Sequence, residues 1–300
     1  MENKKGELAT QQIVLLIVLI ASFAILLLFL FRLNLGETTE KEICHNSVVT
    51  KASSALPTGS VPLNCQRSYL CITKDNSCEK MTKPDKIKVK TEEEVYSVLA
   101  SEMADCWWMF GQGELEYVKK DLTSNLYCSV CSQIAFDDSV NDIFPDGFIY
   151  EELLYYYLEK NDVPNLDETY LEYFYKTNDF GTIKTNLENS GVQFGEINLD
   201  KQYYVMMGIT SEVSAVNWAI GVGVGALALT FLAPAAITGG AFALGTISGV
   251  VAGGGGAGIG TAVGIFVQGL SGNDYLSPSI IEANSEEFEA LGCESIVTLS

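Results

Sequence analysis

Two apolar segments enclose a long polar one in this chain of 300 residues. The first covers residues 13–31 and the second covers residues 213–273, and neither contains a charged side chain. The acidic segment between them holds seven of the eight cysteines. Because a run of about 20 apolar residues matches the thickness of a bilayer, the pattern predicts a membrane protein with one large water-exposed domain.

The N-terminal apolar segment is long enough for a transmembrane helix. At about 1.5 Å per residue, the segment from Ile13 to Phe31 spans roughly 28 Å, close to one hydrocarbon thickness. A cleavable secretory signal has a shorter apolar region that ends in small residues, whereas Arg32 follows directly here. We therefore expect residues 1–32 to form a cytoplasmic tail and an uncleaved membrane anchor.

The C-terminal apolar segment carries glycines at regular intervals. Residues 215–233 and 241–269 form two units of spanning length, with the turn former Pro234 after the first. Glycines four residues apart share a helix face on which backbones can approach closely in lipid. They are Gly221, Gly225, Gly245, Gly249, Gly253, Gly256, Gly260 and Gly264. This spacing predicts a glycine-zipper transmembrane hairpin over residues 213–270, with a third crossing and pore formation as open alternatives.

The polar segment divides into a cysteine-rich module, residues 33–82, and a mixed segment, residues 83–212. In the mixed segment, Thr91 and Glu94 form a capping box that predicts the start of a helix, and Gly111 is a typical stop. The spacing of apolar residues predicts that the buried face of this helix consists of Val95, Val98, Leu99, Met103, Cys106 and Trp107. A ligand platform made of Trp107 and Trp108 is the alternative to burial.

Alternating apolar residues predict strands beside this helix, and hence a disulfide-braced α+β domain. Residues 71–78 have the pattern of a hairpin tip around Asp75-Asn76, and residues 86–90 that of a short strand. A strand over residues 126–136 has an apolar face made of Leu126, Cys128, Val130, Ile134 and Phe136. Further expected elements are helices over 150–160 and 169–176, a strand over 202–210, and a tail, residues 271–300, that returns to the sheet as strand, helix and strand over 275–281, 285–291 and 295–299.

The number of cysteines constrains the compartment and the topology. Eight cysteines, none in an apolar segment, suit four disulfide bonds in an oxidising compartment. One N-terminal and two C-terminal crossings return Cys293 to the side of the other seven cysteines. We therefore expect residues 33–212 and 271–300 to lie outside the cytoplasm, at the cell membrane.

Cys128 and Cys131 have the CxxC spacing of a zinc or redox motif. His45 is the sole histidine, so a zinc site would need four cysteines. In a strand, however, the two cysteines point to opposite faces with α-carbons roughly 10 Å apart, beyond the ~7 Å that a disulfide allows. Structural disulfides are the preferred interpretation, and the expected pairs are Cys106–Cys128, Cys131–Cys293, Cys71–Cys78 and Cys44–Cys65.

The formal net charge of −20 argues against nucleic-acid binding, which needs a basic stripe. Several oxygen-bearing side chains cluster in one expected loop and could bind calcium. The EF-hand spacing is absent, however, so a solvated loop is the simpler interpretation. Its polar residues are Asp137, Asp138, Asn141, Asp142 and Asp146. The sequence contains no serine–histidine–acid set, P-loop or histidine metal motif, and we expect no enzymatic activity, cofactor or metal.

These patterns predict a non-enzymatic membrane-anchored cell-envelope protein that presents an interaction or structural domain. Its expected partners are the lipid bilayer and another protein, or a second copy through the membrane helices. A membrane-tethered thiol–disulfide oxidoreductase that uses Cys128 and Cys131 is the alternative function, and a pore-forming protein is a further one.

Two groups of motifs resemble archaeal proteins. Lys4-Lys5-Gly6-Glu7, followed by a long apolar helix, resembles the class III signal of type IV pilin-like proteins, which implies cleavage after Gly6 and packing into a filament. The chain departs from that pattern because Gln11 and Gln12 stand where an acidic residue is usual. The segments 106–113, 127–131 and 291–293, together with the glycine hairpin, resemble uncharacterised membrane-anchored proteins of archaeal genomes, which implies a lineage and no mechanism.

Overall fold

A computed structural model describes residues 13–23, 25, 39–54, 62–118, 126–189, 194–210, 228–234, 244–245, 263–268, 274–291, 293 and 295–296. The chain divides into two units, residues 1–39 and 40–300. In the first unit, residues 13–23 are helical, and their large apolar side chains are each more than half exposed. No helix among the described residues is both long and apolar enough to cross a membrane. The rest of the predicted anchor lies outside the described residues.

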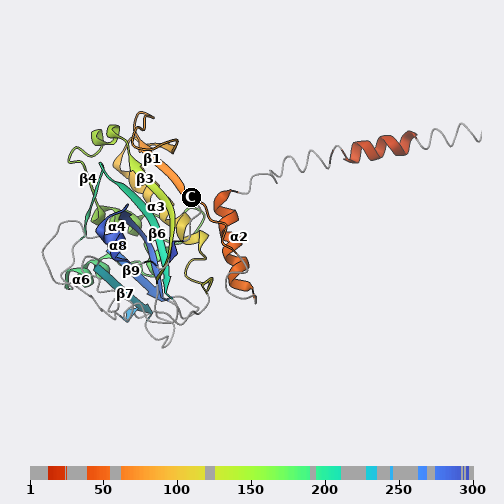
Figure 1. Cartoon of the computed structure of the whole chain (residues 1–300). Coiled ribbons are helices and arrows are strands. Elements are labelled where there is room, and N and C mark those ends of the chain that lie inside the picture. Colours follow the sequence, from red (N-terminus) through yellow and green to blue (C-terminus); the bar gives the residue numbers. More distant parts are fainter. Residues whose placement is uncertain are drawn as a thin grey trace, which may run out of the picture. The chain divides into compact units, whose positions relative to one another are not determined.

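A mixed β-sheet organises the second unit (Figure 1). Its strands follow the order β2-β1-β3-β6-β10-β9-β7-β8, and β11 also pairs with β3. Their bounds are β1 Ser68–Thr73, β2 Asp85–Lys88, β3 Leu126–Phe136, β6 Gln202–Thr210, β7 Ala228–Pro234, β8 Leu244–Gly245, β9 Val263–Gln268, β10 Asp274–Glu282 and β11 Ser295–Ile296. The sheet thereby joins strands from the cysteine-rich segment, the mixed segment and the C-terminal tail.

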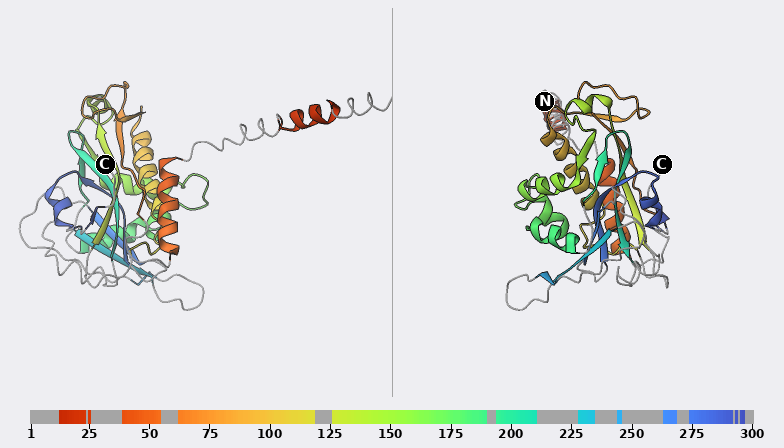
Figure 2. Two further views of the ribbon diagram at one scale, coloured as in Figure 1. Left: turned by 45° about the vertical axis from the view of Figure 1, so that its right-hand side comes forward. Right: turned by 90° about the vertical axis from the view of Figure 1, so that its left-hand side faces the viewer.

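Helices cover both faces of this sheet. Figure 2 shows α3, α4, α5 and α6 on one face and α8 on the other. Their bounds are α3 Glu92–Met109, α4 Glu151–Lys160, α5 Tyr170–Tyr175, α6 Phe180–Asn189 and α8 Glu286–Ala290, while α2, Glu40–Ser53, packs against α3. A 3-10 helix, η1 Asp138–Asp142, follows β3, and β4 Phe148–Tyr150 pairs with β5 Glu196–Asn198 in a separate small sheet. The predicted α+β class and its disulfide bracing are confirmed.

The capping box predicted the start of α3 correctly. The Thr91 side chain accepts a hydrogen bond from the Glu94 N–H, and the Glu94 carboxylate accepts one from the Lys90 N–H. After the last turn, Gly111 has a φ of +82°, and a Cβ there would lie 2.5 Å from the Leu115 side chain. All predicted core positions of α3 are buried except Val98, which is half-buried.

The connection from β1 to β2 differs from the expected hairpin. β1 and β2 are parallel, with Leu70 opposite Asp85 and Thr73 opposite Lys88. Because parallel strands start at the same end of a sheet, residues 74–84 must carry the chain back from the end of β1 to the level of its start. Asn76 adopts a positive φ of 74°, as suits a turn residue, so the turn was placed correctly while the strand direction was not.

The C-terminal apolar segment also differs from its prediction wherever the structure describes it. Residues 228–234 and 263–268 form the parallel strands β7 and β9 in place of helices, and β9 pairs with β10. The sequence of β9, Val-Gly-Ile-Phe-Val-Gln, is rich in β-branched and aromatic residues, which favour strands over helices. Gly245 and Gly264 lie in β8 and β9, and the other six zipper glycines lie outside the described residues.

The tail returns to the sheet as predicted. β10, α8 and β11 follow the expected order of strand, helix and strand, and Ser285 caps α8 by accepting a hydrogen bond from the Phe288 N–H. The strand β6 and the helices α4 and α5 also lie where their patterns predicted them. The helices α2 and α6 were not predicted.

Candidate functional site

The CxxC motif lies on β3, in the middle of the sheet. The antiparallel register between β3 and β6 shifts, since Val130 lies opposite Met206 whereas Ser132 lies opposite Val205. Cys131 is therefore the extra residue of a β-bulge. Because side chains in a strand alternate with a period of two residues, one extra residue exchanges the two faces of the strand beyond it.

The bulge splits the apolar face that the sequence predicted for β3. Ile134 and Phe136 belong, with Cys131, to the main hydrophobic core, which also contains the buried face of α3. Leu126, Cys128 and Val130 are at most 1% exposed but lie outside that core. They face the other side of the sheet, the side of α8 and the C-terminal tail.

All eight cysteines form disulfide bonds. The pairs and their Cα–Cα distances are Cys44–Cys65 at 4.4 Å, Cys71–Cys78 at 6.4 Å, Cys106–Cys131 at 5.5 Å and Cys128–Cys293 at 5.6 Å. The first two pairs confirm the prediction. The predicted pairs Cys106–Cys128 and Cys131–Cys293 are wrong, because the bulge places Ile134 and Phe136 on the α3 side with Cys131 and leaves Cys128 on the side of the tail.

The motif has the geometry of a cross-link. Cys128 is fully buried, Cys131 is 4% exposed, and each is bonded to a partner outside the motif. A redox motif needs an accessible thiolate in electropositive surroundings. No group of three or more metal-ligating side chains occurs within the described part of the chain. Together the two disulfides fasten β3 to α3 on one face and to the tail on the other.

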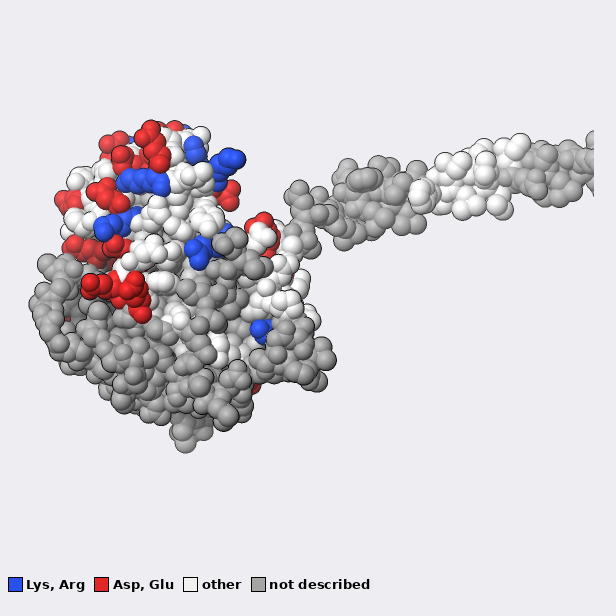
Figure 3. All heavy atoms as spheres, in the orientation of Figure 1, with Lys and Arg blue, Asp and Glu red and all other residues white. Residues whose placement is uncertain are grey.

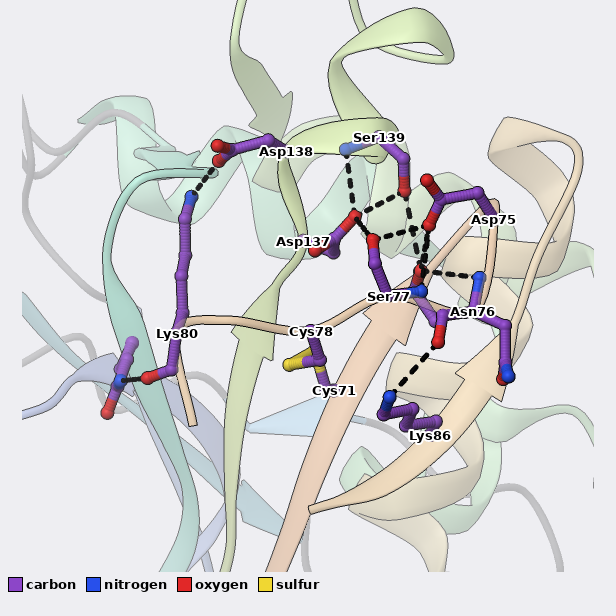
Figure 4. Close-up of a disulfide and its surroundings, with 12 residues drawn as sticks. Cys71, Asp75, Asn76, Ser77, Cys78, Lys80, Lys86, Asp137, Asp138 and Ser139 are labelled. Atoms are coloured by element: carbon purple, nitrogen blue, oxygen red, sulfur yellow. Dashed lines mark hydrogen bonds and ion pairs between the residues drawn. A yellow bond between two sulfur atoms is a disulfide. The ribbon is translucent and has the colours of Figure 1, made fainter. Parts of the chain in front are cut away.

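A polar network surrounds the Cys71–Cys78 disulfide at the end of β1 (Figure 4). Asp137 caps η1, and its carboxylate accepts hydrogen bonds from the Ser139 N–H at 3.0 Å and from the Ser139 and Ser77 hydroxyls at 2.6 and 2.8 Å. Asp75 accepts from the Ser77 hydroxyl and N–H, and these bonds lower the pKa of Asp75 to about 2. Burial opposes ionisation of Asp137, yet hydrogen bonds from Ser139 hold its pKa below the usual value.

Asp138 and Asp142 of this loop have separate partners. Lys80 forms ion pairs with Asp138 at 2.8 Å and with Asp200 at 3.2 Å. Lys74 forms one with Asp142 at 3.0 Å. Three of the carboxylates that the sequence grouped as a calcium alternative thus have other partners: serines for Asp137 and lysines for Asp138 and Asp142. The described residues contain no group of three side chains placed to hold a metal ion. Nothing in the sequence signals that Asp75 and Asp137 share the Ser77 hydroxyl.

The two adjacent tryptophans separate into different environments. Trp107 is fully buried, and its indole N–H donates to the Tyr173 carbonyl at 3.1 Å. Trp108 is half-buried and stacks on His45 of α2, with ring centroids 4.2 Å apart. The His45 Nδ1 also lies 2.7 Å from the Trp108 carbonyl oxygen. A shared ligand platform is therefore not formed, and the sole histidine serves the contact between α2 and α3.

Two buried carboxylates have raised pKa values that the sequence did not signal. Burial raises the pKa of Glu151, at the start of α4, to about 7, although the Gly195 N–H donates to its carboxylate at 2.9 Å. Burial likewise raises the pKa of Glu102 on α3, opposed by Lys41 of α2 at 3.2 Å. Each carboxylate joins two segments, so each serves a structural contact.

Comparisons with known proteins add no assignment. A scan against family models finds no match, and searches of curated proteins and of solved structures find none either. What the chain does must therefore be inferred from its own chemistry, in which cross-links and surface charge are the most distinctive features.

Proposed function

We propose that this chain is a non-enzymatic cell-envelope protein that presents a disulfide-stabilised domain outside the cytoplasm, anchored in the membrane by residues 13–31. One observation carries the proposal: all eight cysteines are paired in four disulfides. Such cross-links form and persist in oxidising compartments, where thiol reductants do not cleave them. We propose further that the protein belongs to a pilus-like or other assembly of the cell envelope.

The Cys128–Cys293 bond supports a simple topology. Bonded cysteines lie on one side of a membrane, so the chain between them crosses an even number of times, zero included. The strands β7 and β9 lie in the same sheet as β3, which favours zero. We therefore propose that the N-terminal segment is the membrane attachment and that residues 40–300 lie outside.

The first unit supports the anchor. Residues 13–23 form a helix whose large apolar side chains are between 55% and 65% exposed. Exposed apolar area is unfavourable in water, and about 25 cal/mol is gained for each Å² that lipid or a packed assembly covers. The composition of the helix therefore supports membrane insertion.

The alternative is a thiol–disulfide oxidoreductase that uses Cys128 and Cys131. The burial of both sulfurs and their bonds to Cys293 and Cys106 favour the structural role over the catalytic one. An insulin-reduction assay on the full chain distinguishes the two, and we expect no turnover above that of the Cys128→Ser variant.

Topology is tested with the full chain carrying one tag at each end, expressed in sealed cells. We expect a membrane-impermeant reagent to label the C-terminal tag and not the N-terminal one. Replacement of Leu16 and Ile20 by arginine should release the protein from the membrane, since each arginine costs about 3 kcal/mol at a helix centre. The matched exchange Leu16→Ile with Ile20→Leu should keep it bound. Labelling of the N-terminal tag, or a soluble unaltered chain, would contradict the proposal.

A further inference from the structure

The basic residues of this acidic chain are unevenly distributed. Five of its 18 lysines and arginines fall within residues 80–90, a stretch in which Asp85 is the only acidic residue. Lys83, Lys86, Lys88 and Lys90 are all exposed, and none of the four forms an ion pair with a carboxylate in the part of the chain that the structure describes. On the face shown in Figure 3, acidic residues otherwise predominate over the described surface.

These lysines lie on or beside β2, the terminal strand of the sheet. Its only neighbour among the described strands is β1. A terminal strand presents unpaired backbone groups along its outer side, and an extended segment can add there as a further strand. The outer side of β2 is therefore an unpaired strand edge, and the exposed lysines on and beside it outnumber Asp85, the one acidic residue of the strand.

The hydrogen bonds of β2 show which backbone groups face outward. The Val89 N–H donates to the Thr73 carbonyl of β1 at 2.9 Å. Because every second residue of a strand turns its backbone toward the same neighbour, Ile87 and Val89 face β1, whereas Lys86 and Lys88 face away. The Lys90 N–H, which also faces away, is already bonded to the Glu94 carboxylate at 2.6 Å. The available edge is therefore short and centred on Lys86 and Lys88.

The side chains of β2 alternate between lysine and an apolar residue over positions 86–88. Lys86 and Lys88 lie on one face of the sheet, while Ile87 is half-buried against the core on the other. An open depression of about 390 Å³ adjoins the end of the strand, lined by Lys88, Val89, Lys90, Glu94, Ser97 and Val98. A strand paired here would place its own alternate side chains directly opposite the two lysines.

We propose that the outer edge of β2 binds an extended segment of a partner protein that carries carboxylates at alternate positions. The lysines exclude neutral and basic strands, because pairing would desolvate their charges without compensation. Glutamates or aspartates at alternate positions compensate both charges while the backbone pairs. This inference rests on the proposed function in one respect: an interaction domain needs a surface that binds its partner. It adds to that function the site and the kind of segment that binds there.

The test uses the purified full chain with its disulfides intact and a fluorescein-labelled peptide, Thr-Glu-Val-Glu-Val-Thr. Fluorescence anisotropy at low ionic strength should show saturable binding. A peptide of the same composition with adjacent glutamates, Thr-Val-Glu-Glu-Val-Thr, should bind several-fold more weakly, because one carboxylate then faces away from the lysines.

The variant Lys86→Glu with Lys88→Glu should lose at least about tenfold in affinity, since two favourable cross-strand pairs become repulsive. The same variant should gain binding to Thr-Lys-Val-Lys-Val-Thr, which excludes unfolding as the cause of the loss. The charge-matched control, Lys160→Glu with Lys176→Glu, changes two exposed lysines elsewhere and should bind like the unaltered chain.

Equal binding of the two acidic peptides, or full binding by the Lys86→Glu, Lys88→Glu variant, would overturn the inference. So would two other results in the absence of peptide binding: lysine-dependent binding to phosphatidylglycerol vesicles, which assigns the edge to lipid, or lysine-dependent dimerisation, which assigns it to a second copy. The tag-labelling result in sealed cells does not depend on this outcome, so failure here is distinguishable from failure of the proposed function.

Discussion

The centre and the edge of the sheet are held together in different ways. At the centre, β3 carries one disulfide on each face, and these bridge separations of 25 and 165 residues. Near the edge, the Cys71–Cys78 disulfide links β1 to the loop after it and bridges 7 residues. A network of serine hydroxyls and carboxylates surrounds this disulfide. A cross-link restricts the unfolded chain more when its loop is longer. The centre is therefore stabilised mainly through the unfolded state, and the edge mainly through hydrogen bonds of the folded state.

This difference separates the firm part of the domain from the part that can adjust. Segments at the margin of a sheet, held by exposed hydrogen bonds, open at lower free energy than segments whose opening requires global unfolding. The strand that we propose as a docking edge, β2, lies at this margin and is paired on one side only, with β1. The loop that leads into β2, residues 74–84, can therefore adapt to a partner while the disulfides on β3 hold the rest of the domain together.

The carboxylates of the two kinds of region also differ. Near the edge, hydrogen bonds from Ser77 lower the pKa of Asp75 to about 2. In the helical layer, burial raises the pKa of Glu151 to about 7. Acid therefore weakens the edge network only at very low pH, whereas a rise toward neutral pH disfavours the buried Glu151.

The largest expected effect comes from removing the long cross-link. Loop-closure entropy predicts that Cys128→Ala with Cys293→Ala lowers the free energy of unfolding by about 5 kcal/mol, against about 2.5 kcal/mol for Cys71→Ala with Cys78→Ala. Urea unfolding of the full chain, followed by tryptophan fluorescence, measures both. Equal losses, or a larger loss for the short loop, would break the distinction between centre and edge.

A second prediction changes pH and leaves all disulfides intact. Because the pKa of Glu151 is raised from 4.5 to about 7, its stabilising contribution is complete below pH 4.5 and is lost as pH rises to about 7. The loss amounts to about 3 kcal/mol. Glu151→Gln keeps an acceptor for the Gly195 N–H but cannot ionise, so the difference in unfolding free energy between the two proteins should change by that amount across this window. The exposed control Glu79→Gln should leave the pH dependence unchanged, and a constant difference for Glu151→Gln would refute the assignment.

The smallest effect is expected at the edge network. Asp137→Ala removes the cap of η1 and leaves the Ser77 and Ser139 hydroxyls without this acceptor, at a cost of about 1–2 kcal/mol. Hydrogen exchange should accelerate in residues 138–143 and remain slow in β3. Uniform acceleration through β3 would show that edge and centre unfold as one unit.

Helix α3 and strand β3 show how far the sequence predicts this fold. A helix has a fixed period, so Thr91, Glu94 and the apolar spacing after them were enough to place α3 and its buried face. A strand has a period of two, and a single bulge at Cys131 reverses everything beyond it. The bulge depends on pairing with β6, which lies about 70 residues away in sequence and has no local signal. The bulge separates Cys128 from Ile134 and Phe136, with which the sequence grouped it, and the predicted disulfide partners were exchanged for that reason.

Other differences have the same origin in contacts distant along the chain. The strand character of residues 228–234 and 263–268 depends on pairing within the sheet, whereas the glycine spacing suggested helices. The network of Asp75 and Asp137 joins loops 62 residues apart, and neither loop signals the other. The charged edge, in contrast, was available to sequence reasoning, because residues 80–90 stand out in an acidic chain.

Disulfide mapping without reduction tests the central claim most directly, namely that β3 presents Cys131 to α3 on one face and Cys128 to the tail on the other, in an oxidised, extracytoplasmic domain. The full chain is isolated with free thiols blocked, and the linked peptides are fragmented between Cys128 and Cys131 in the mass spectrometer. We predict Cys106–Cys131 and Cys128–Cys293 links with no blocked thiol. A Cys128–Cys131 bond, a Cys106–Cys128 bond, or free thiols that hold zinc would contradict the account.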